Sequence, residues 1–173
     1  CEICDQDLKH RKNRNPIHHR EWRIKKPASI FEKLGRYGKE PTLGNLERYI
    51  MDVAGVRVIC SYIHDVYNLL ELLQKQDDLE IVEIKDYINN PKLNGYRSLH
   101  VIVRIPVYFL DKKELIPVEV QLRPIAMDFW ASLEHDLQYN SVSEVQGIDS
   151  YDELKDCSRI LEAAEAHTQK PAR

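Results

Sequence analysis

Residues 118–123, Val-Glu-Val-Gln-Leu-Arg, alternate strictly between apolar and polar side chains, and this alternation constrains the fold more than any other feature. Successive side chains of a β-strand point to opposite faces of the sheet. The segment is therefore expected to form a strand with one apolar face, and Glu119, Gln121 and Arg123 share the other face. A carboxylate between two valines faces either solvent or a functional site.

A second strong signal is the dense β-branched run in residues 53–62, with Gly55 inside it, which predicts a buried strand. Apolar residues at helical spacing in residues 64–76 predict a helix. The other expected elements are helices over residues 2–15, 27–35 and 124–139 and from residue 150 onward, a strand over 79–87, and a hairpin of 99–109 with 114–122. Gly35 is expected to end the helix over 27–35, and the last helix has an expected apolar stripe of Leu154, Cys157, Ile160, Leu161 and Ala164. This order predicts the α/β (α+β) class, a mixed sheet of about four to five strands flanked by helices.

Composition is that of a soluble globular protein, with 43% hydrophobic and 31% charged residues. The length corresponds most simply to a single domain over residues 1–173. A net charge of −3 argues against a protein that binds long nucleic acids through its overall charge. No apolar run approaches a membrane span, no secretory signal opens the sequence, and the four cysteines lack framework spacing. We therefore expect a cytoplasmic protein with no membrane segment.

The first group of candidate site residues is basic and lies in residues 23–33. Arg23 and Lys25 alternate along an extended stretch that leads to a helix N-terminus at Ser29. Lys33 follows four residues later, on the same helical face as Ser29. Cations near a helix N-terminus form a cradle for phosphates, because the free N–H groups and the helix dipole already favour anions. The alternative is a solvated basic surface with Ser29 as an N-cap.

The second group is Asp52, just before the buried strand, and Arg57, five residues later. An aspartate at this position can hold Mg²⁺, and a planar guanidinium can face a base or a phosphate. The alternative is that Asp52 caps a turn and Arg57 pairs with an acidic neighbour. The segment by itself leaves both interpretations open.

The third group lies in residues 86–100, a loop followed by the start of a strand. Tyr96 follows an Asn-Gly pair, where a turn would free the ring to stack on a base. Three side chains lie close enough in the chain to contact phosphates: Lys92, Arg97 and His100. Glu119 on the neighbouring strand can bind a metal or accept a proton from a ribose hydroxyl. The alternatives are that Tyr96 is an aromatic residue packed at the corner of a hairpin and that His100 is a hydrogen-bonded histidine of the core.

Five motifs occur in order along the chain. They are Arg-x-Lys-x-x-x-Ser-Ile-x-x-Lys, Asp-x-Ala-Gly-x-Arg, Asp-Tyr-Ile-x-x-Pro-Lys-x-Asn-Gly-Tyr-Arg-Ser-x-His, Glu-x-Gln-x-Arg and Ala-Met-Asp-Phe-Trp-Ala-x-x-Glu-His. Together they resemble the synthetase domain of the RelA/SpoT family, most closely its short members, the small alarmone synthetases. The resemblance spans residues 15–139 and implies a nucleotidyltransferase-like synthetase fold.

The resemblance also implies an activity, a GTP pyrophosphokinase that transfers the β,γ-pyrophosphate of ATP to the 3′-OH of GDP or GTP, giving (p)ppGpp and AMP. The implied ATP ligands are Arg23 and Arg57, which stack on adenine, and Lys25, Ser29 and Lys33, which hold the phosphates. Asp52 and Glu119 are implied to be catalytic and to position Mg²⁺, with Glu119 as the base for the 3′-OH. The implied GDP or GTP ligands are Lys92, Asn94, Tyr96, Arg97, His100, Gln121, Arg123 and Glu134.

The resemblance further implies a homotetramer, with helices over about residues 1–15 and 150–167 as oligomerisation elements. Regulation by (p)ppGpp or single-stranded RNA is consistent with it, and the preference between GDP and GTP stays open. Two other functions fit parts of the pattern. One is a different nucleotidyltransferase, which would release pyrophosphate instead of AMP. The other is a module that binds nucleotides or single-stranded RNA without catalysis.

Overall fold

Five strands form one mixed sheet in the order β1-β2-β5-β4-β3. The computed structural model describes residues 14–140 and 149–168. The strands are β1 (Ile17–Ile24), β2 (Ala54–Cys60), β3 (Glu80–Asp86), β4 (Leu99–Tyr108) and β5 (Lys113–Pro124). β2 and β5 are parallel, and the other neighbouring strands are antiparallel. The predicted fold class, a mixed sheet with flanking helices, is confirmed.

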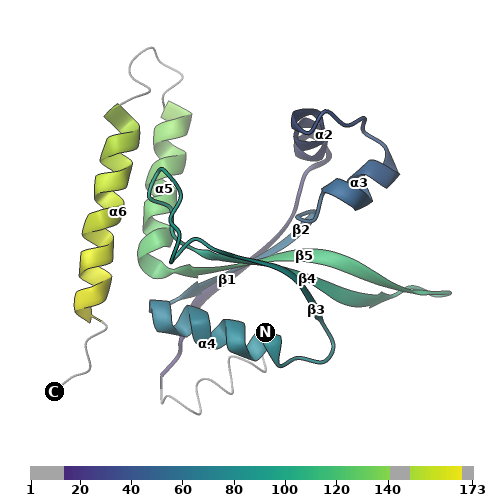
Figure 1. Ribbon diagram of the computed structural model, residues 1–173, viewed down its shortest axis with the longest axis horizontal. Coiled ribbons are helices and arrows are strands. Elements are labelled where there is room, and N and C mark those ends of the chain that lie inside the picture. Colours follow the sequence, from purple (N-terminus) through teal and green to yellow (C-terminus); the bar gives the residue numbers. More distant parts are fainter. Residues whose placement is uncertain (1–13, 141–148, 169–173) are drawn as a thin grey trace.

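Helices cover the two faces of the sheet differently (Figure 1). The helices are α2 (Pro27–Arg36), α3 (Leu43–Tyr49), α4 (Ile63–Gln74), α5 (Ile125–Asn140) and α6 (Asp149–Thr168). α4 lies against one face, whereas the α2–α3 pair and the α5–α6 pair stand over the other side at opposite ends. No helix within residues 14–140 or 149–168 is long and apolar enough to cross a membrane. Of the helix expected at the N-terminus, residues 1–13 lie outside the described residues.

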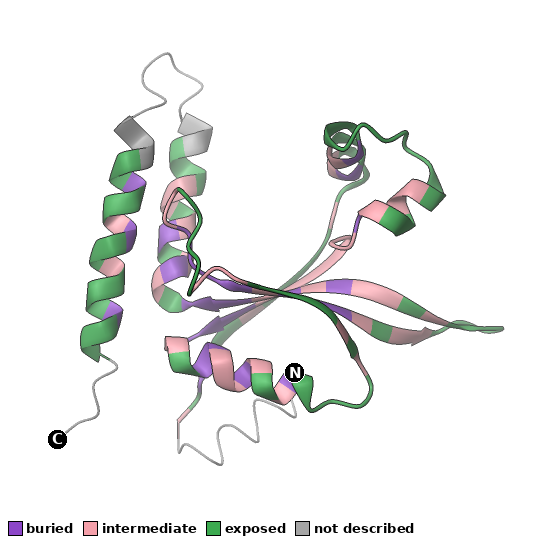
Figure 2. Ribbon diagram, viewed as in Figure 1, coloured by how far each residue is buried: buried purple, intermediate pink, exposed green. Residues whose placement is uncertain are grey.

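The apolar face of the sheet packs against α4 and forms the main core. On β5 this face consists of Val118, Val120 and Leu122, as their alternation with polar residues predicts. Val66 and Leu69, four and seven residues into the helical pattern of α4, pack against them. Figure 2 shows buried residues gathered where α4 and α5 meet the sheet.

The opposite face of the sheet is polar, and the strand register sets its layout. Gln121 on β5 pairs with His100 on β4 on one side and with Arg57 on β2 on the other. Glu119, two residues earlier, pairs with Gly55. Side chains at directly paired positions lie on the same face of a sheet. The register therefore brings polar residues from three strands together on the face that α4 does not cover.

Two elements of the fold differ from the sequence expectation. β1 was expected only as an extended stretch; it is an edge strand whose exposed side chains, including Trp22 and Ile24, lack an apolar alternation. α3 has seven residues and is capped by Thr42, whose hydroxyl accepts a hydrogen bond from Asn45 N at 3.2 Å. Neither element carries enough apolar periodicity to be recognised without its tertiary contacts.

The boundaries of α2 also correct the expectation. Its N-cap is Lys26, so Ser29 lies inside the first turn and is neither the cap nor the first helical residue. At the other end, the helix continues through Gly35 to Arg36. Gly38, with φ of 64°, adopts the left-handed conformation beyond the helix end, whereas Gly35, the expected stop, lies inside the helix.

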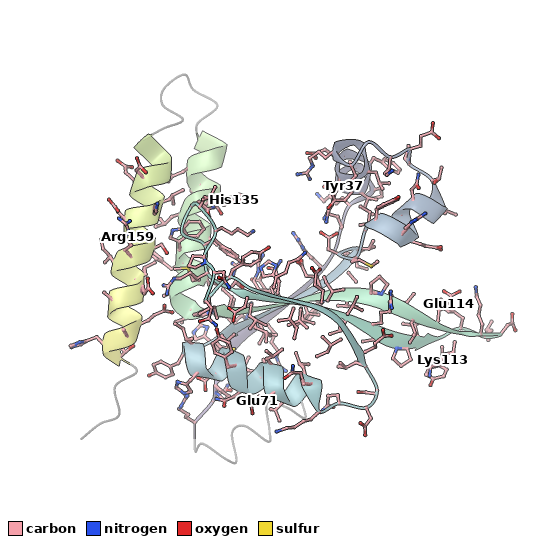
Figure 3. All side chains as sticks on the ribbon, in the orientation of Figure 1. Tyr37, Glu71, Lys113, Glu114, His135 and Arg159 are labelled. Atoms are coloured by element: carbon pink, nitrogen blue, oxygen red, sulfur yellow. The ribbon has the colours of Figure 1, made fainter. Side chains whose placement is uncertain are left out.

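The hairpin of β4 and β5 is confirmed, and its far end projects from the rest of the molecule, with Lys113 and Glu114 on it (Figure 3). The last helix, predicted from residue 150, begins at Asp149. Its buried face differs from the predicted apolar stripe of Leu154, Cys157, Ile160, Leu161 and Ala164. Ile160 is 71% exposed and Ala164 is exposed, whereas Ser158 and Glu165 are buried.

Candidate active site

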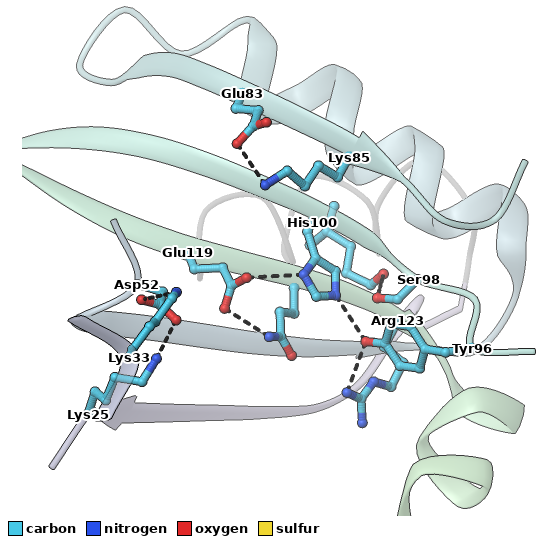
Figure 4. A network of polar contacts seen from close by, with 12 residues as sticks. Lys25, Lys33, Asp52, Glu83, Lys85, Tyr96, Ser98, His100, Glu119 and Arg123 are labelled. Atoms are coloured by element: carbon cyan, nitrogen blue, oxygen red, sulfur yellow. Dashed lines mark hydrogen bonds and ion pairs between the residues drawn. The ribbon is translucent and has the colours of Figure 1, made fainter. Parts of the chain in front are cut away.

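Asp52 is held between two lysines at one end of the polar face (Figure 4). Its Oδ2 lies 2.5 Å from Nζ of Lys25, which follows β1, and its Oδ1 lies 2.9 Å from Nζ of Lys33 on α2. Burial alone would raise the pKa of the Asp52 carboxyl, but the hydrogen bonds and charges of the two lysines outweigh burial and lower it. The structure thus brings together Lys25, Lys33 and Asp52 as an ionised cluster.

A chain of hydrogen bonds runs along the polar face to Glu119 (Figure 4). Arg123 Nη2 lies 3.1 Å from Oη of Tyr96, and the same oxygen lies 3.0 Å from Nε2 of His100. Nδ1 of His100 then lies 3.0 Å from Oε1 of Glu119. Gln121 Nε2 donates to the other oxygen, Oε2, at 2.9 Å. The chain therefore fixes both carboxylate oxygens of Glu119.

The donors and acceptors of this chain give it a direction. A guanidinium only donates hydrogen bonds, and an ionised carboxylate only accepts them. Arg123 therefore donates to the Tyr96 oxygen, and Nδ1–H of His100 donates to Glu119. Tyr96 Oη and His100 Nε2 share the bond between them, and with either direction of that bond His100 is a donor to the carboxylate.

Glu119 stays ionised although it is largely buried. Burial alone would raise the pKa of its carboxyl, but the interactions with His100 and Gln121 outweigh burial and lower it. The charge of Asp52 acts in the opposite direction, so the two carboxylates lie close enough to influence each other. An ionised carboxylate on a concave face can accept a proton from a bound hydroxyl.

A small cavity of about 110 Å³ opens above Gly55 between two arginines. Arg23 on β1 pairs with Gly55, and Arg57 lies two residues along β2 from it. Arg57 Nη1 is held 3.2 Å from Oε2 of Glu21. The lining residues are Glu21, Trp22, Arg23, Gly55, Val56, Arg57, Glu119 and Gln121. Because Gly55 has no side chain, a planar group can approach the strand between the two guanidinium groups.

A second cavity of about 450 Å³ lies between the sheet and α5 and shares Arg57 with the first. Its other lining residues are Arg123, Asp128, Ala131, Ser132, Glu134, His135 and Asp136. Glu134 Oε1 accepts a hydrogen bond from Nδ2 of Asn94 at 2.6 Å, so α5 is connected to the loop that precedes β4. Arg123 and Glu134 therefore both line this cavity, and Asn94 is connected to it through its hydrogen bond to Glu134.

Tyr96 lies in the predicted neighbourhood, but its ring is not free. It is 6% exposed and packs in a cluster with Met127, Trp130 and Leu154, so the expectation that the turn frees the ring is wrong. Lys92 Nζ lies 4.9 Å from the centroid of the Tyr96 ring. The ring is buried because α5 and α6 pack against the turn that carries it.

Of two other expected ligands, Arg97 lies away from the predicted position, whereas Ser29 keeps its predicted place on the same side of α2 as Lys33. Arg97 is 2% exposed and points to α6, where its Nη2 lies 3.0 Å from Oε2 of Glu165. The structure therefore does not bring Arg97 to the polar face. Ser29 lies on α2 one turn before Lys33, which places the two side chains on one side of the helix.

Lys85 is a cation at the site that the sequence interpretation missed. It pairs with His100 across β3 and β4, so it lies on the polar face, and its Nζ is 3.0 Å from Glu83. Interactions with Glu83 and the charge of Glu119 help to raise the pKa of Lys85. The signal that could have found it is the alternation in residues 80–86, which puts Lys85 on one face with Glu83.

The carboxylates of Asp52 and Glu119 are the site's candidates for a metal. Within residues 14–140 and 149–168, no group of three or more His, Cys, Asp or Glu side chains is arranged to hold a metal ion. Two carboxylates suit Mg²⁺, which usually binds proteins through one or two carboxylates and completes its shell with water and substrate phosphates. The donor set therefore fits Mg²⁺ delivered together with a nucleotide.

Comparison with known proteins identifies relatives of this chain. A family model for the region found in RelA / SpoT proteins matches residues 22–144. GTP pyrophosphokinase YwaC of Bacillus subtilis is 48% identical over 146 residues, covering 84% of this chain and 69% of that protein. GTP pyrophosphokinase YjbM of the same bacterium is 38% identical over 125 residues, and the chain spans 58% of its length.

Two solved structures share the fold. Small alarmone synthetase 2 from Bacillus subtilis aligns with a TM-score of 0.83 and 42% identity, over 96% of this chain and 85% of that one. Small alarmone synthetase 1 from the same bacterium, bound to its product pppGpp, aligns with a TM-score of 0.86 and 28% identity, over 98% of this chain and 85% of that one. The chain therefore belongs to the RelA/SpoT family and resembles its small alarmone synthetases.

Proposed function

We propose that this protein is a GTP pyrophosphokinase, which transfers the β,γ-pyrophosphate of ATP to the ribose 3′-OH of GDP or GTP and releases AMP. The observation that carries the proposal is the pair of cavities that share Arg57, with the ionised Glu119 in the wall of the first. Two nucleotides need two adjoining sites, and a sugar hydroxyl needs a base. The names of the relatives, GTP pyrophosphokinases, support the same reaction.

On the donor side, adenine would lie over Gly55 between Arg23 and Arg57, whose guanidinium planes stack well on a base. The ATP phosphates would then extend towards Lys25, Lys33 and Ser29. Both lysines are paired with Asp52 in the structure. Phosphate oxygens would replace the carboxylate as partners of the lysines, which releases Asp52 to bind Mg²⁺.

The proposed cofactor is Mg²⁺, held by Asp52 and Glu119 together with the nucleotide phosphates. When bound, it would neutralise the charge that makes two anionic nucleotides repel each other. Every other contribution comes from the chain itself. The lysines orient the donor, and the strand register fixes the distance between the arginines and Glu119.

The chemical step is a displacement at the β-phosphorus of ATP. Glu119 takes the proton of the 3′-OH as the ribose oxygen forms a bond to the β-phosphorus. The bond from that phosphorus to the α,β-bridging oxygen breaks, and the electron pair leaves with AMP. His100 holds the carboxylate in place through the bond from Nδ1. Tyr96 and Arg123 in turn hold His100 and act as positioning residues.

The acceptor would occupy the larger cavity beside α5. Glu134 and Asn94 offer an acceptor and a donor to the base edge, and guanine carries adjacent N–H groups that suit a carboxylate. Cations for the acceptor phosphates would be Lys92 and Arg123, with Gln121 and His100 nearby. The Tyr96 ring is buried and Lys92 lies over it, so the acceptor base is not placed on that ring.

The test is product analysis with Mg²⁺, ATP and GDP or GTP, comparing the wild type with Glu119→Gln. The expected result is AMP formed one-for-one with a guanosine 3′-pyrophosphate, and at least a hundredfold less in the variant, on the order of the loss of a general base. Glu114→Gln, on the same strand but at the projecting end, should match the wild type. Pyrophosphate release instead of AMP would indicate a different nucleotidyltransferase. Nucleotide binding without AMP would indicate a binding module.

Assembly as a homotetramer is part of the proposal, with α6 as an interface element. The exposed face of α6 supports this, because it carries Ile160 at 71% exposure. A charge at this position should weaken the contact between copies without disturbing the core. Ile160→Glu should therefore lower the molar mass measured by light scattering, with an unchanged circular dichroism spectrum. An unchanged mass would exclude this face.

A further inference from the structure

The buried face of α6 contains polar side chains that meet the loop between β3 and β4. Ser158 Oγ donates to the carbonyl oxygen of Gly95 at 2.5 Å. Glu165, two turns further along α6, accepts a hydrogen bond from Arg97 Nη2 at 3.0 Å. Polar groups on the buried side of a helix require specific partners, and both partners here belong to residues 87–98, hereafter the acceptor loop.

The acceptor loop lies directly against the helix at Gly95. This residue has φ of 87°, and a Cβ built on it would lie 2.8 Å from Cβ of Ser158. No larger residue fits there without a shift of the loop or the helix. The close approach fixes the distance between the backbone of the loop and α6.

The ion pair of Arg97 and Glu165 is buried: the two residues are 2% and 8% exposed. Among the described residues, neither Nε of Arg97 nor Oε1 of Glu165 has a hydrogen-bond partner. A buried, incompletely bonded ion pair is weak as a source of stability, but it strongly resists separation of its two partners. The pair therefore fixes a position more than it stabilises the fold. Glu162, at 62% exposure and 3.7 Å from Arg97 Nη1, contributes much less.

Residues 94–97 alternate between the two sides of the acceptor loop. Asn94 and the Tyr96 hydroxyl face the site, where they bond to Glu134 and to the His100–Arg123 chain. Gly95 and Arg97 face α6. Any movement of the loop away from α6 would therefore displace the two side chains that face the site.

We propose that α6 positions the acceptor loop for the guanosine nucleotide, with Glu165 and Ser158 as positioning residues. The inference rests on the proposed function, because it assigns the loop to the acceptor. Both residues lie beyond residues 22–144, the part of the chain that the family model matches. An acceptor loop released from α6 would become ordered only when the guanosine nucleotide binds. The apparent affinity for that nucleotide is then reduced in proportion to the fraction of molecules whose loop is already in the binding conformation. The adenine cavity has no α6 residue in its lining, so ATP binding should be spared.

The experiment compares Glu165→Gln with the matched control Glu162→Gln. In Glu165→Gln the KM for GDP and GTP should rise about tenfold, equivalent to about 1.4 kcal/mol, within the range for one hydrogen bond to a charged group. The KM for ATP should stay within about twofold, and Glu162→Gln should match the wild type in both. Ser158→Ala, which loses one neutral hydrogen bond, should raise the acceptor KM about threefold. Hydrogen exchange should quicken at amides of the acceptor loop in both α6 variants.

Other outcomes separate this inference from the proposed function. If Glu165→Gln and Ser158→Ala fold and keep the wild-type KM for GDP and GTP, the positioning role is overturned. A KM for ATP that rises as much as the KM for GDP and GTP overturns it as well. If Glu165→Gln fails to fold, Ser158→Ala decides. If the wild type forms no AMP, the proposed reaction fails. GDP binding measured by calorimetry without ATP then tests positioning alone, and equal GDP affinity in wild type and variants overturns it.

Discussion

Gly55→Ala should separate ATP binding from stability, because the two are expected to change in opposite senses. The glycine lies in β2 at the floor of the cavity of about 110 Å³, between Arg23 and Arg57. A Cβ at this position would meet Arg23 Cγ and the Glu119 carbonyl oxygen at 3.7 Å each, and Arg23 Nε at 3.8 Å. These are ordinary van der Waals contacts, so the folded protein can accept the methyl group. It would stand where the proposed adenine lies closest to the strand.

The magnitudes follow from this geometry. Replacing glycine by alanine without strain stabilises a protein by about 0.4–1 kcal/mol, because the unfolded chain loses freedom. For a domain of this size that corresponds to a rise in Tm of about 1–4 °C. Lifting a base off its stacking contacts costs about 1–3 kcal/mol, and 1.4 kcal/mol is a tenfold change in affinity. We therefore expect an ATP KM about tenfold higher, an unchanged acceptor KM, and an equal or higher Tm.

Steady-state kinetics with each nucleotide varied in turn, together with calorimetric unfolding, measures all three quantities. Gly44→Ala is the matched control, because a Cβ on that α3 residue meets nothing within 4 Å. It should raise Tm slightly and leave both KM values unchanged. An unchanged KM for ATP in Gly55→Ala would refute the placement of adenine over this strand. An equal rise in the KM values for ATP and for the acceptor would refute the claim that the substitution affects ATP binding alone.

Three further changes test other parts of the site. Asp52→Asn should have a lower free energy of unfolding than the wild type at neutral pH. This difference should narrow as the pH falls below about 4, because a carboxyl with a lowered pKa contributes its full stability only above the ordinary aspartate value. Urea unfolding from pH 3 to 7 measures the difference, and a constant value would contradict the prediction. Tyr96→Phe keeps the ring but removes the oxygen between Arg123 and His100. We expect the free energy of unfolding to fall by about 1–2 kcal/mol and kcat to fall as well. An unchanged kcat would show that this chain of hydrogen bonds does not hold Glu119. Lys33→Met should raise the KM for ATP and leave the KM for GTP unchanged in the same kinetic assay, and the reverse pattern would assign this cation to the acceptor.

The parts of the site that the sequence predicted correctly depend on strand alternation. Period-2 patterning puts Glu119 and Gln121 on one face whatever the rest of the chain does. Their partners on β4 and β2, such as His100 and Arg57, follow once the strands pair in register. Asp52 was placed because it directly precedes the buried strand, and its two lysines come from the segment that leads into and through α2.

The parts that were wrong depend on contacts between distant segments. Tyr96 follows a turn, which predicts an exposed ring, but Trp130 and Leu154 cover it, and no local pattern indicates that. Arg97 was assigned to phosphates because it lies close in the chain to Lys92 and His100. Its partner, Glu165, lies 68 residues later in the chain. The predicted apolar stripe of α6 failed for the same reason, since its buried face includes Ser158 and Glu165 in place of Ile160.

The two carboxylates of the site, Asp52 and Glu119, both have charged or polar partners within the protein. Asp52 is neutralised by two lysines, and Glu119 accepts from His100 and Gln121. A buried charge without a partner is costly, so this pairing limits the loss of stability that burying these charges would cause. Binding then becomes an exchange of partners, in which phosphates take the lysines and a metal can take the released carboxylate. The free energy of each exchange is the difference between two states in which every charge has a partner. A neutral ligand of the same shape offers the lysines and the carboxylate no new partners. The site therefore favours a polyanionic nucleotide that carries its own divalent ion.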